Sequence, residues 1–337
     1  MKPIINLLFL ALIILSCTNN SKYRYAIRDF SNELKPYLEK IVSRGIAGYD
    51  LSVIYLRDHA ADSELSRISR SEHPVLRMVT LRIMQQRDSL NLFGFLMSHL
   101  DDSAIVAIDE GEFGINFRRI PDVLLKILLW KTVENKNKII EKVLLKHNYL
   151  YYAYKVLDYL EPEEKYYQSI KEMAQRDRPY EEIDFAVYGL AKFKKQEDIK
   201  LIVSILYENK WQLEGHSFLL MEKYPHDDYL NILSFYAKEH FARNIISGRQ
   251  AVPSEEFFNA LASYKRKETA ELLPVLLNRI SRVGCYTDTN YLKMSLYQAF
   301  LKNKCEAYSS ILPQIELDLE KVIKEMQAKQ RRYNEIR

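Results

Sequence analysis

Residues 71–96 read SEHPVLRMVTLRIMQQRDSLNLFGFL, and this stretch decides the prediction for the whole chain. Leu81 and Met84 lie three positions apart, which places both on one face of a helix. The polar residues 85–88 interrupt the pattern, and apolar residues return eight, nine and twelve positions after Met84. A helix, a polar turn and a second helix are therefore predicted.

The same pattern returns four times later in the chain. The residues that correspond to Met84 recur every 31 to 40 residues in this later part, and they are Phe193, Tyr224, Tyr264 and Phe300. Each has the same apolar neighbours, except that Ser309 replaces an apolar residue in the last copy. Four turn residues stand where an N-cap would accept the first amides of the second helix: Asp88, Asp198, Asp228 and Thr269.

Helical pairs at this spacing are typical of an α-solenoid, because no single pair can bury its own apolar face. Residues 71–86, in which Pro74 and then Val-x-Arg77 open a helix, resemble a HEAT repeat, and residues 185–193 look like the same helix in a second copy. This resemblance implies an all-α fold, an α-solenoid of stacked antiparallel helix pairs over residues 61–315. Tetratricopeptide repeats and a helical bundle without repeats are the alternatives.

Three segments lie outside the repeats. Residues 24–60 carry two amphipathic stretches and are predicted to form an N-terminal helical cap. Residues 101–118 interrupt the repeats with a short predicted β-hairpin that has an acidic tip. Residues 316–337 are predicted to form a charged C-terminal helix.

The first residues indicate where the protein works. A charged residue precedes an apolar run over residues 4–15, which is the layout of a secretory signal peptide and is too short to span a bilayer. With a small residue before Cys17, the segment resembles the lipobox of bacterial lipoproteins. That resemblance implies a signal peptide over residues 1–16, lipidation of Cys17, a tether over residues 17–23 and, from Thr18, an outer-membrane location facing the periplasm. A signal peptide cut elsewhere and an uncleaved anchor are the alternatives.

The composition favours helices and argues against a nucleic-acid partner. The chain has only 9 Gly and 10 Pro in 337 residues, so turn and strand signals are scarce. The net charge of +4 is small and both signs are interspersed, unlike the basic surface of a nucleic-acid binder. The solenoid is also similar to HEAT-type DNA-repair enzymes, but export and balanced charge disfavour that function.

No standard catalytic or nucleotide-binding motif is present, so a non-catalytic protein without a cofactor is predicted. The best metal candidate is the His-Asp-Asp run at 226–228 with His216, but these residues also fill a turn, and no metal site is predicted. The hairpin tip, with two Asp residues at 101–102 before it, is a weaker calcium candidate than a solvated turn.

Cys285 and Cys305 are the cysteines that remain after Cys17. A disulfide between them fits an oxidising compartment. A helix over the intervening residues would hold the two thiols apart. A disulfide and a pair of buried free thiols therefore both stay open.

Loops on a rigid scaffold often carry function. The carboxylates of the hairpin tip, Asp109, Glu110 and Glu112, are therefore candidate partner-binding residues, as are Tyr151 and Tyr152, which cannot both face the core. The predicted function is a lipid-anchored scaffold of the cell envelope that binds a protein or peptide partner. The alternative is a glycan-binding protein or a hydrolase that uses the aromatic and acidic region 101–167.

Overall fold

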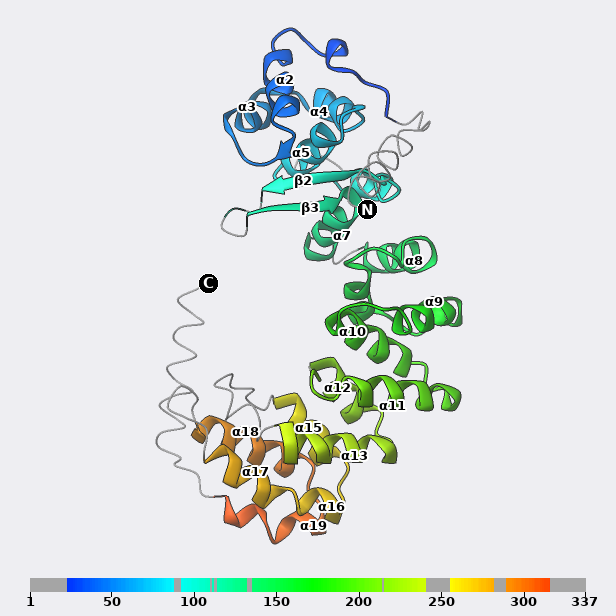
Figure 1. Cartoon of the computed structure of the whole chain (residues 1–337), viewed down its shortest axis with the longest axis vertical. Coiled ribbons are helices and arrows are strands. Elements are labelled where there is room, and N and C mark those ends of the chain that lie inside the picture. The colour runs from blue at the N-terminus through cyan, green and yellow to red at the C-terminus, as the bar shows by residue number, and fades with distance from the viewer. Residues whose placement is uncertain are drawn as a thin grey trace, which may run out of the picture. The chain divides into compact units, whose positions relative to one another are not determined.

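The computed structural model describes residues 23–87, 92–109, 111, 114–131, 135–213, 215–240, 255–281 and 289–315. The chain divides into two compact units, Met1–Tyr159 and Leu160–Arg337 (Figure 1). The division falls inside the range that the sequence analysis assigned to one repeat array. The predicted C-terminal helix over 316–337 lies outside the described residues, as do the predicted signal peptide and Cys17.

The first unit is mostly helical and contains one small sheet. Its helices are η1 (Ile27–Asp29), α2 (Lys35–Arg44), α3 (Leu51–His59), α4 (Asp62–Ile68), α5 (Pro74–Gln85), α6 (Leu92–Ser98), α7 (Ile120–Lys131), α8 (Lys136–Lys146) and η4 (Ala153–Tyr159). Its strands are β1 (Ile46–Ala47), β2 (Ile105–Asp109) and β3 (Ile115–Arg119). Strand β2 contacts α5 and strand β3 contacts α7, so the sheet lies between these two helices (Figure 1).

The sheet has the strand order β1-β2-β3. Strands β2 and β3 form the predicted antiparallel hairpin, in which Val106 pairs with Arg118 and Ala107 with Phe117. The sequence analysis missed β1, which pairs in parallel with β2 through Ile46 and Ala47. A two-residue strand leaves no alternation of apolar and polar residues to detect.

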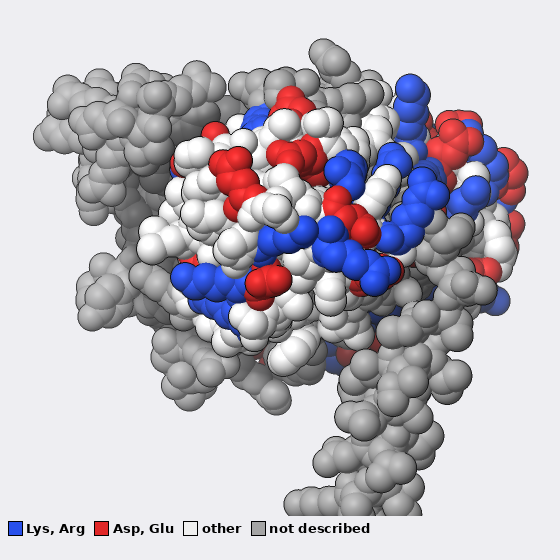
Figure 2. Space-filling model, turned by 90° about the horizontal axis from the view of Figure 1, so that it is seen from above, with Lys and Arg blue, Asp and Glu red and all other residues white. Residues whose placement is uncertain are grey.

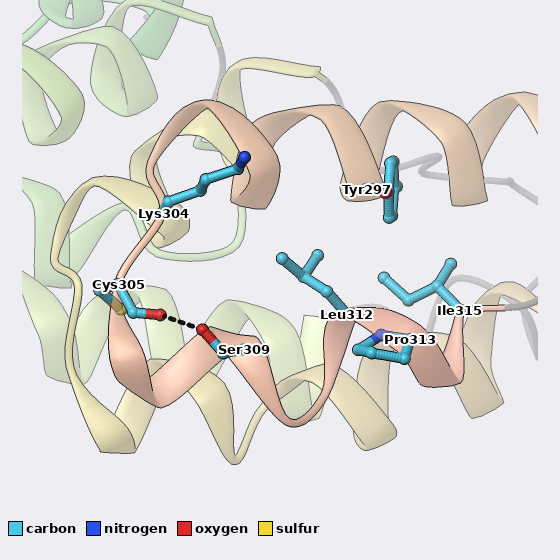
Figure 3. Close-up of a pocket in the computed structure, with 7 residues that line it drawn as sticks. All are labelled: Tyr297, Lys304, Cys305, Ser309, Leu312, Pro313 and Ile315. Atoms are coloured by element: carbon cyan, nitrogen blue, oxygen red, sulfur yellow. Dashed lines mark hydrogen bonds between the residues drawn. The ribbon is translucent and has the colours of Figure 1, made fainter.

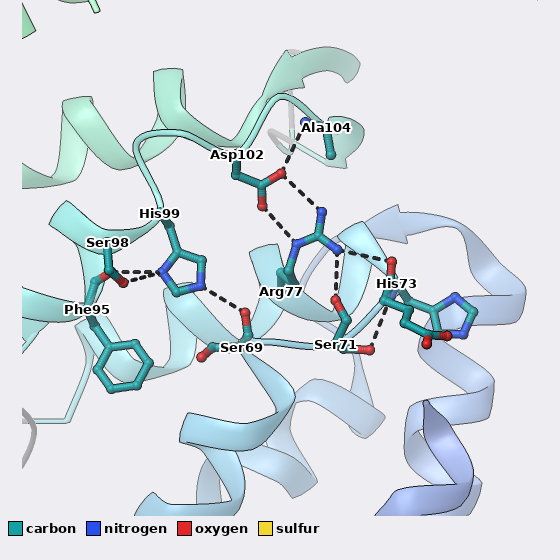
Figure 4. Close-up of polar contacts among 10 residues, drawn as sticks. Ser69, Ser71, His73, Arg77, Phe95, Ser98, His99, Asp102 and Ala104 are labelled. Carbon is teal, nitrogen blue, oxygen red and sulfur yellow. Dashed lines mark hydrogen bonds and ion pairs between the residues drawn. The ribbon is translucent and has the colours of Figure 1, made fainter. Parts of the chain in front are cut away.

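Helix α5 is the centre of the first unit, and its polar contacts hold the surrounding loops (Figure 4). Arg77 and Asp102 are almost fully buried and form a two-pronged ion pair, with N···O distances of 2.8 and 3.0 Å. The same guanidinium donates to the carbonyl oxygen of Ser71 and lies 4.0 Å from the ring centre of Tyr23. Burial, together with the Asp102 carboxylate, raises the pKa of Tyr23. The calcium candidate formed by the hairpin tip and residues 101–102 therefore loses the carboxylate of Asp102, which is paired with Arg77.

The second unit is built from helices, with no strand among its described residues. Its elements are α9 (Glu164–Ala174), α10 (Tyr180–Ala191), η5 (Gln196–Asp198), α11 (Ile199–Glu208), α12 (Gly215–Lys223), α13 (Asp227–Phe235), the π-helical turn η6 (Tyr236–His240), α15 (Glu255–Ser263), α16 (Lys267–Ala270), α17 (Leu273–Ile280), α18 (Thr289–Lys302), α19 (Glu306–Ser309) and η7 (Leu312–Gln314). Helices α10, α12, α15 and α18 each pack against the next. Helices α11 and α13 also contact each other, so helical pairs lie side by side (Figure 1).

The predicted turns fall between helices, but their capping groups differ from the prediction. The carboxylate of Asp198 makes no capping bond and instead accepts hydrogen bonds from Tyr167 and Lys171. His226 caps α13, because its side chain accepts from the amide of Asp228. Thr269 lies inside the short helix α16 rather than at its start, and Asp88 lies outside the described residues. The sequence pattern thus predicted where the turns lie. It did not predict which side chain accepts the first backbone amides of each helix, because polar side chains near a helix start can form other hydrogen bonds instead.

Two lysines end helices in the left-handed conformation. Lys194 follows α10 with φ of 55°, and Lys265 follows α15 with φ of 53°. Both come directly after a residue that corresponds to Met84 in the repeat. The two turns therefore share a backbone conformation as well as a sequence pattern.

Charges of both signs lie side by side over the face shown in Figure 2. Of the helices that the structure describes, none combines the length and apolar character required to cross a bilayer.

Candidate functional site

A cavity of about 700 Å³ lies in the first unit where the hairpin passes α5 and α7. We call it the hairpin pocket. Its lining residues come from five parts of the unit: Tyr49, Arg82, Gln85, Ile108, Asp109, Gly111, Arg118, Val123, Lys126, Ile127 and Tyr152. Two of them, Asp109 and Tyr152, are residues that the sequence analysis selected.

The strand alternation decides which residues of the hairpin reach this pocket. Arg118 pairs with Val106, which is buried, whereas its neighbour Arg119 pairs with the exposed Ile105. Successive side chains of a strand point to opposite faces. Arg118 therefore lines the pocket, and Arg119 belongs to the other face of the sheet.

Three cationic side chains and one carboxylate line the hairpin pocket. The cations are Arg82, Arg118 and Lys126, and the carboxylate is Asp109. Arg82 donates a hydrogen bond of 3.2 Å to the carbonyl oxygen of Ala47. Among the described residues, neither Arg118 nor Lys126 forms an ion pair. The described part of the lining is thus cationic, although the chain as a whole is nearly balanced.

The aromatic rings of the pocket lie beside these cations. Arg82 lies 5.2 Å from the ring centre of Tyr49, and Lys126 lies 5.8 Å from that of Tyr152. Arg118 lies 5.5 Å from the ring centre of Tyr151, which in turn packs edge-on against Tyr152. Such contacts hold flexible cationic side chains near a ring face and leave their charged ends available to an anion.

The carboxylate of Asp109 is partly committed to its own loop. It accepts a hydrogen bond of 3.0 Å from the amide of Gly111 and lies 3.9 Å from a guanidinium nitrogen of Arg44. Gly48 approaches it closely, because a Cβ atom at Gly48 would lie 3.1 Å from the Cβ of Asp109. Asp109 therefore shapes the rim of the pocket more than it supplies free charge.

The sequence analysis found part of this site. Asp109 and Tyr152 line the pocket, and Tyr151 lies behind Tyr152, whereas Glu110 and Glu112 lie outside the described residues. The three cations were missed, because they are far apart in the sequence and a basic residue on a helix or strand carries no signal of its own. The arginine pair at 118–119, at the end of the second hairpin strand, was the one signal available.

The described residues of the two metal candidates do not assemble into ion-binding groups. Arg266 binds Asp227 at 2.5 Å, and His216 lies 3.6 Å from Asp184 rather than near the turn at 226–228. Asp101 contacts His147 at 3.3 Å. The described residues hold no group of three or more His, Cys, Asp or Glu side chains arranged to bind a metal ion.

A second cavity, of about 850 Å³, lies near the end of the described residues (Figure 3). Apolar side chains and Tyr297 provide most of its described lining, in which Lys304 is the one charged group. Cys305 also lines it as a free cysteine, and its carbonyl oxygen accepts a hydrogen bond from Ser309. Cys285, its candidate disulfide partner, lies outside the described residues.

Comparisons of the chain with family models, with curated proteins and with solved structures found no match. The site must therefore be interpreted from its own chemistry. Guanidinium and ammonium groups bind carboxylate or phosphate oxygens, and tyrosine rings supply apolar contact area with a polar end. The hairpin pocket is suited to an anionic group attached to an aromatic or apolar chain.

Proposed function

We propose that this protein is a lipid-anchored, non-catalytic scaffold of the cell envelope that binds an acidic segment of a partner protein in the hairpin pocket. The observation that carries the proposal is the convergence of Arg82, Arg118 and Lys126 on one cavity beside Tyr49 and Tyr152. Arginine and tyrosine are the residue types that contribute most to protein interfaces.

The opposite face of the sheet supports a protein partner rather than a small ligand alone. Ile105, Ile115 and Phe117 are exposed there, and Phe117 has 73 % of its surface accessible. Exposed apolar groups close together are typical of interaction surfaces.

The side-by-side packing of α10, α12, α15 and α18 supports the HEAT-like solenoid as the architecture of the scaffold. The anchor rests on the resemblance of residues 1–17 to a lipobox. The backbone amides of residues 24 and 25 both donate to the carbonyl of Arg70, so the chain is held to the first unit from this point on.

The binding test compares two adjacent arginines. A labelled peptide in which Glu alternates with Tyr is titrated into the full mature chain, with the same peptide carrying Gln in place of Glu as the ligand control. We expect Arg118→Gln to weaken binding of the acidic peptide by about tenfold, because a charge-assisted hydrogen bond is lost. Arg119→Gln removes the same charge on the other face and is expected to leave the affinity unchanged.

Equal affinities for the acidic and the neutral peptide, or equal effects of the two arginine variants, would overturn the proposed pocket. Retention of an oligosaccharide instead, with affinity insensitive to salt, would favour the glycan-binding alternative.

The anchor is tested separately by fractionating cells that express the wild-type chain or Cys17→Ala. We expect the wild type in the membrane fraction with a lipid-modified Cys17 detected by mass spectrometry, and the variant outside that fraction. An unmodified Cys17 in the wild type would contradict the anchor without affecting the pocket.

A further inference from the structure

A separate cavity of about 310 Å³ lies in the second unit, between the turn that joins α10 to α11 and the turn that joins α12 to α13. We call it the turn pocket. Its walls come from two consecutive repeats: Leu190, Ala191, Lys194, Lys195, Gln196, Ile199, Ile202, Lys223, Tyr224, Pro225, His226 and Tyr229. The proposed function makes no use of these residues.

Three lysines and a histidine line the turn pocket, and none of the described lining residues is a carboxylate. Lys195 is already paired with Glu164 at 2.7 Å, and its ammonium lies 3.5 Å from the ring centre of Tyr167. Lys223 donates to the hydroxyl of Tyr188 at 3.3 Å. These contacts fix two of the cations at the edge of the cavity.

Lys194 is the cation that remains available. It forms no ion pair with a described residue, and its ammonium lies 5.8 Å from the ring centre of Tyr224. Its backbone has φ of 55°, a conformation in which glycine is favoured over lysine. A lysine at this position thus places a free ammonium beside the pocket at a cost in backbone strain.

The interior of the turn pocket is apolar, and Tyr229 forms part of its wall. Leu190 and Ile202 are buried, and Ile199 lies beside them. Tyr229 is almost fully buried, and its burial raises its pKa to about 12. Its hydroxyl therefore keeps its proton at neutral pH and can donate a hydrogen bond to an oxygen anion.

Cationic groups at the edge, an apolar interior and a protonated hydroxyl define one class of ligand. We propose that the turn pocket binds a carboxylate attached to an apolar body, of which the C-terminal residue of a peptide and a free organic acid are the two sources. The volume is at the lower end of the range for small-molecule sites, which fits one such residue rather than a longer segment.

The test uses the full mature chain and three probes: a short peptide that ends in Leu with a free carboxylate, the same peptide with a C-terminal amide, and octanoate. We expect the carboxylate peptide to bind at least about tenfold more tightly than the amide, because the amide carries no charge for the lysines. Binding of octanoate without the peptide would assign the site to free acids and keep the shared chemistry.

Lys194→Gln and Lys265→Gln form a matched pair, because both lysines have the same backbone conformation and only Lys194 lines the cavity. Lys194→Gln is expected to weaken binding by about tenfold and Lys265→Gln to leave it unchanged. Lys223→Gln gives a second lining variant. Equal binding of the carboxylate and amide peptides, or equal affinities of the two matched variants, would overturn the proposal. These results do not depend on the hairpin pocket, which lies in the other unit.

Discussion

The guanidinium of Arg77 is a charge that the first unit holds away from water. Asp102 pairs with it, and the Ser71 and Glu72 carbonyls accept its remaining hydrogen bonds, so the desolvated charge is compensated on several sides. In the sequence, Arg77 is part of the stretch that resembles a HEAT repeat. Its buried ion pair with Asp102 could not be predicted, because the partner lies in a loop 25 residues away.

Loss of one partner of this pair is expected to be costly. Asp102→Asn should lower the free energy of unfolding by about 3 to 5 kcal/mol, because it leaves the Arg77 charge buried without a counter-charge. Asp101→Asn is the control, since the Asp101 side chain is 62 % exposed and should cost less than about 1 kcal/mol. Denaturant unfolding of both variants measures the difference, and equal losses would contradict the interpretation.

His147 is expected to make the stability depend on pH. Burial lowers the pKa of its imidazole, Asp101 opposes that shift, and Lys142 and Lys146 add to it. The unfolded chain therefore takes up a proton near pH 6.5 while the folded chain does not, so the free energy of unfolding falls as the pH drops below about 6.5.

His147→Phe removes this titration. We expect its free energy of unfolding to fall less than that of the wild type between about pH 7.5 and about pH 5.5, as measured by denaturant unfolding. His59→Phe, which changes an exposed histidine, should follow the wild type. A full wild-type loss in His147→Phe would show that other groups cause the pH dependence.

At the scale of the elements, the sequence predicted a mostly helical chain with one β-hairpin, because both carry a periodic pattern over many residues. The helices between residues 125 and 167 matched the repeat pattern only loosely. The sequence did not predict β1, or the capping roles that His226 took from Asp228. Of the residues that line the hairpin pocket, the sequence analysis selected Asp109 and Tyr152 as candidate binding residues. It missed Arg82, Arg118 and Lys126, which only the packing of α5, β3 and α7 brings together.

The helix end at Lys265 allows a test of backbone strain. Lys265→Gly should raise the free energy of unfolding by up to about 1 kcal/mol, because glycine adopts a positive φ without the clash of a Cβ atom. Gln175 ends α9 with φ of −94°, so Gln175→Gly is expected to destabilise instead. Thermal and denaturant unfolding measure the change in stability of both variants. A loss of stability in Lys265→Gly would contradict the argument that Lys265 is strained.

At the scale of the whole molecule, the two compact units should unfold as separate cooperative transitions. Asp102→Asn is expected to lower the transition of the first unit alone. Phe258→Ala, which deletes a fully buried ring of α15, should lower that of the second unit by about 3 to 5 kcal/mol. Differential scanning calorimetry of both variants measures the two unfolding transitions. A single transition that both variants shift equally would contradict independent unfolding of the units.

The first described residues are held against the first unit, and this limits how far Cys17 can lie from that unit. Tyr25 pairs with Ser71, and the amide of Glu72 donates to the carbonyl of Tyr25, so the chain is held from this point onward. Five residues separate Cys17 from Tyr23, and a fully extended chain of that length spans at most about 22 Å. The proposed lipid on Cys17 would therefore keep the loop between α4 and α5 within about one small-domain diameter of the lipid headgroups. The first unit would then meet its partners close to the membrane surface.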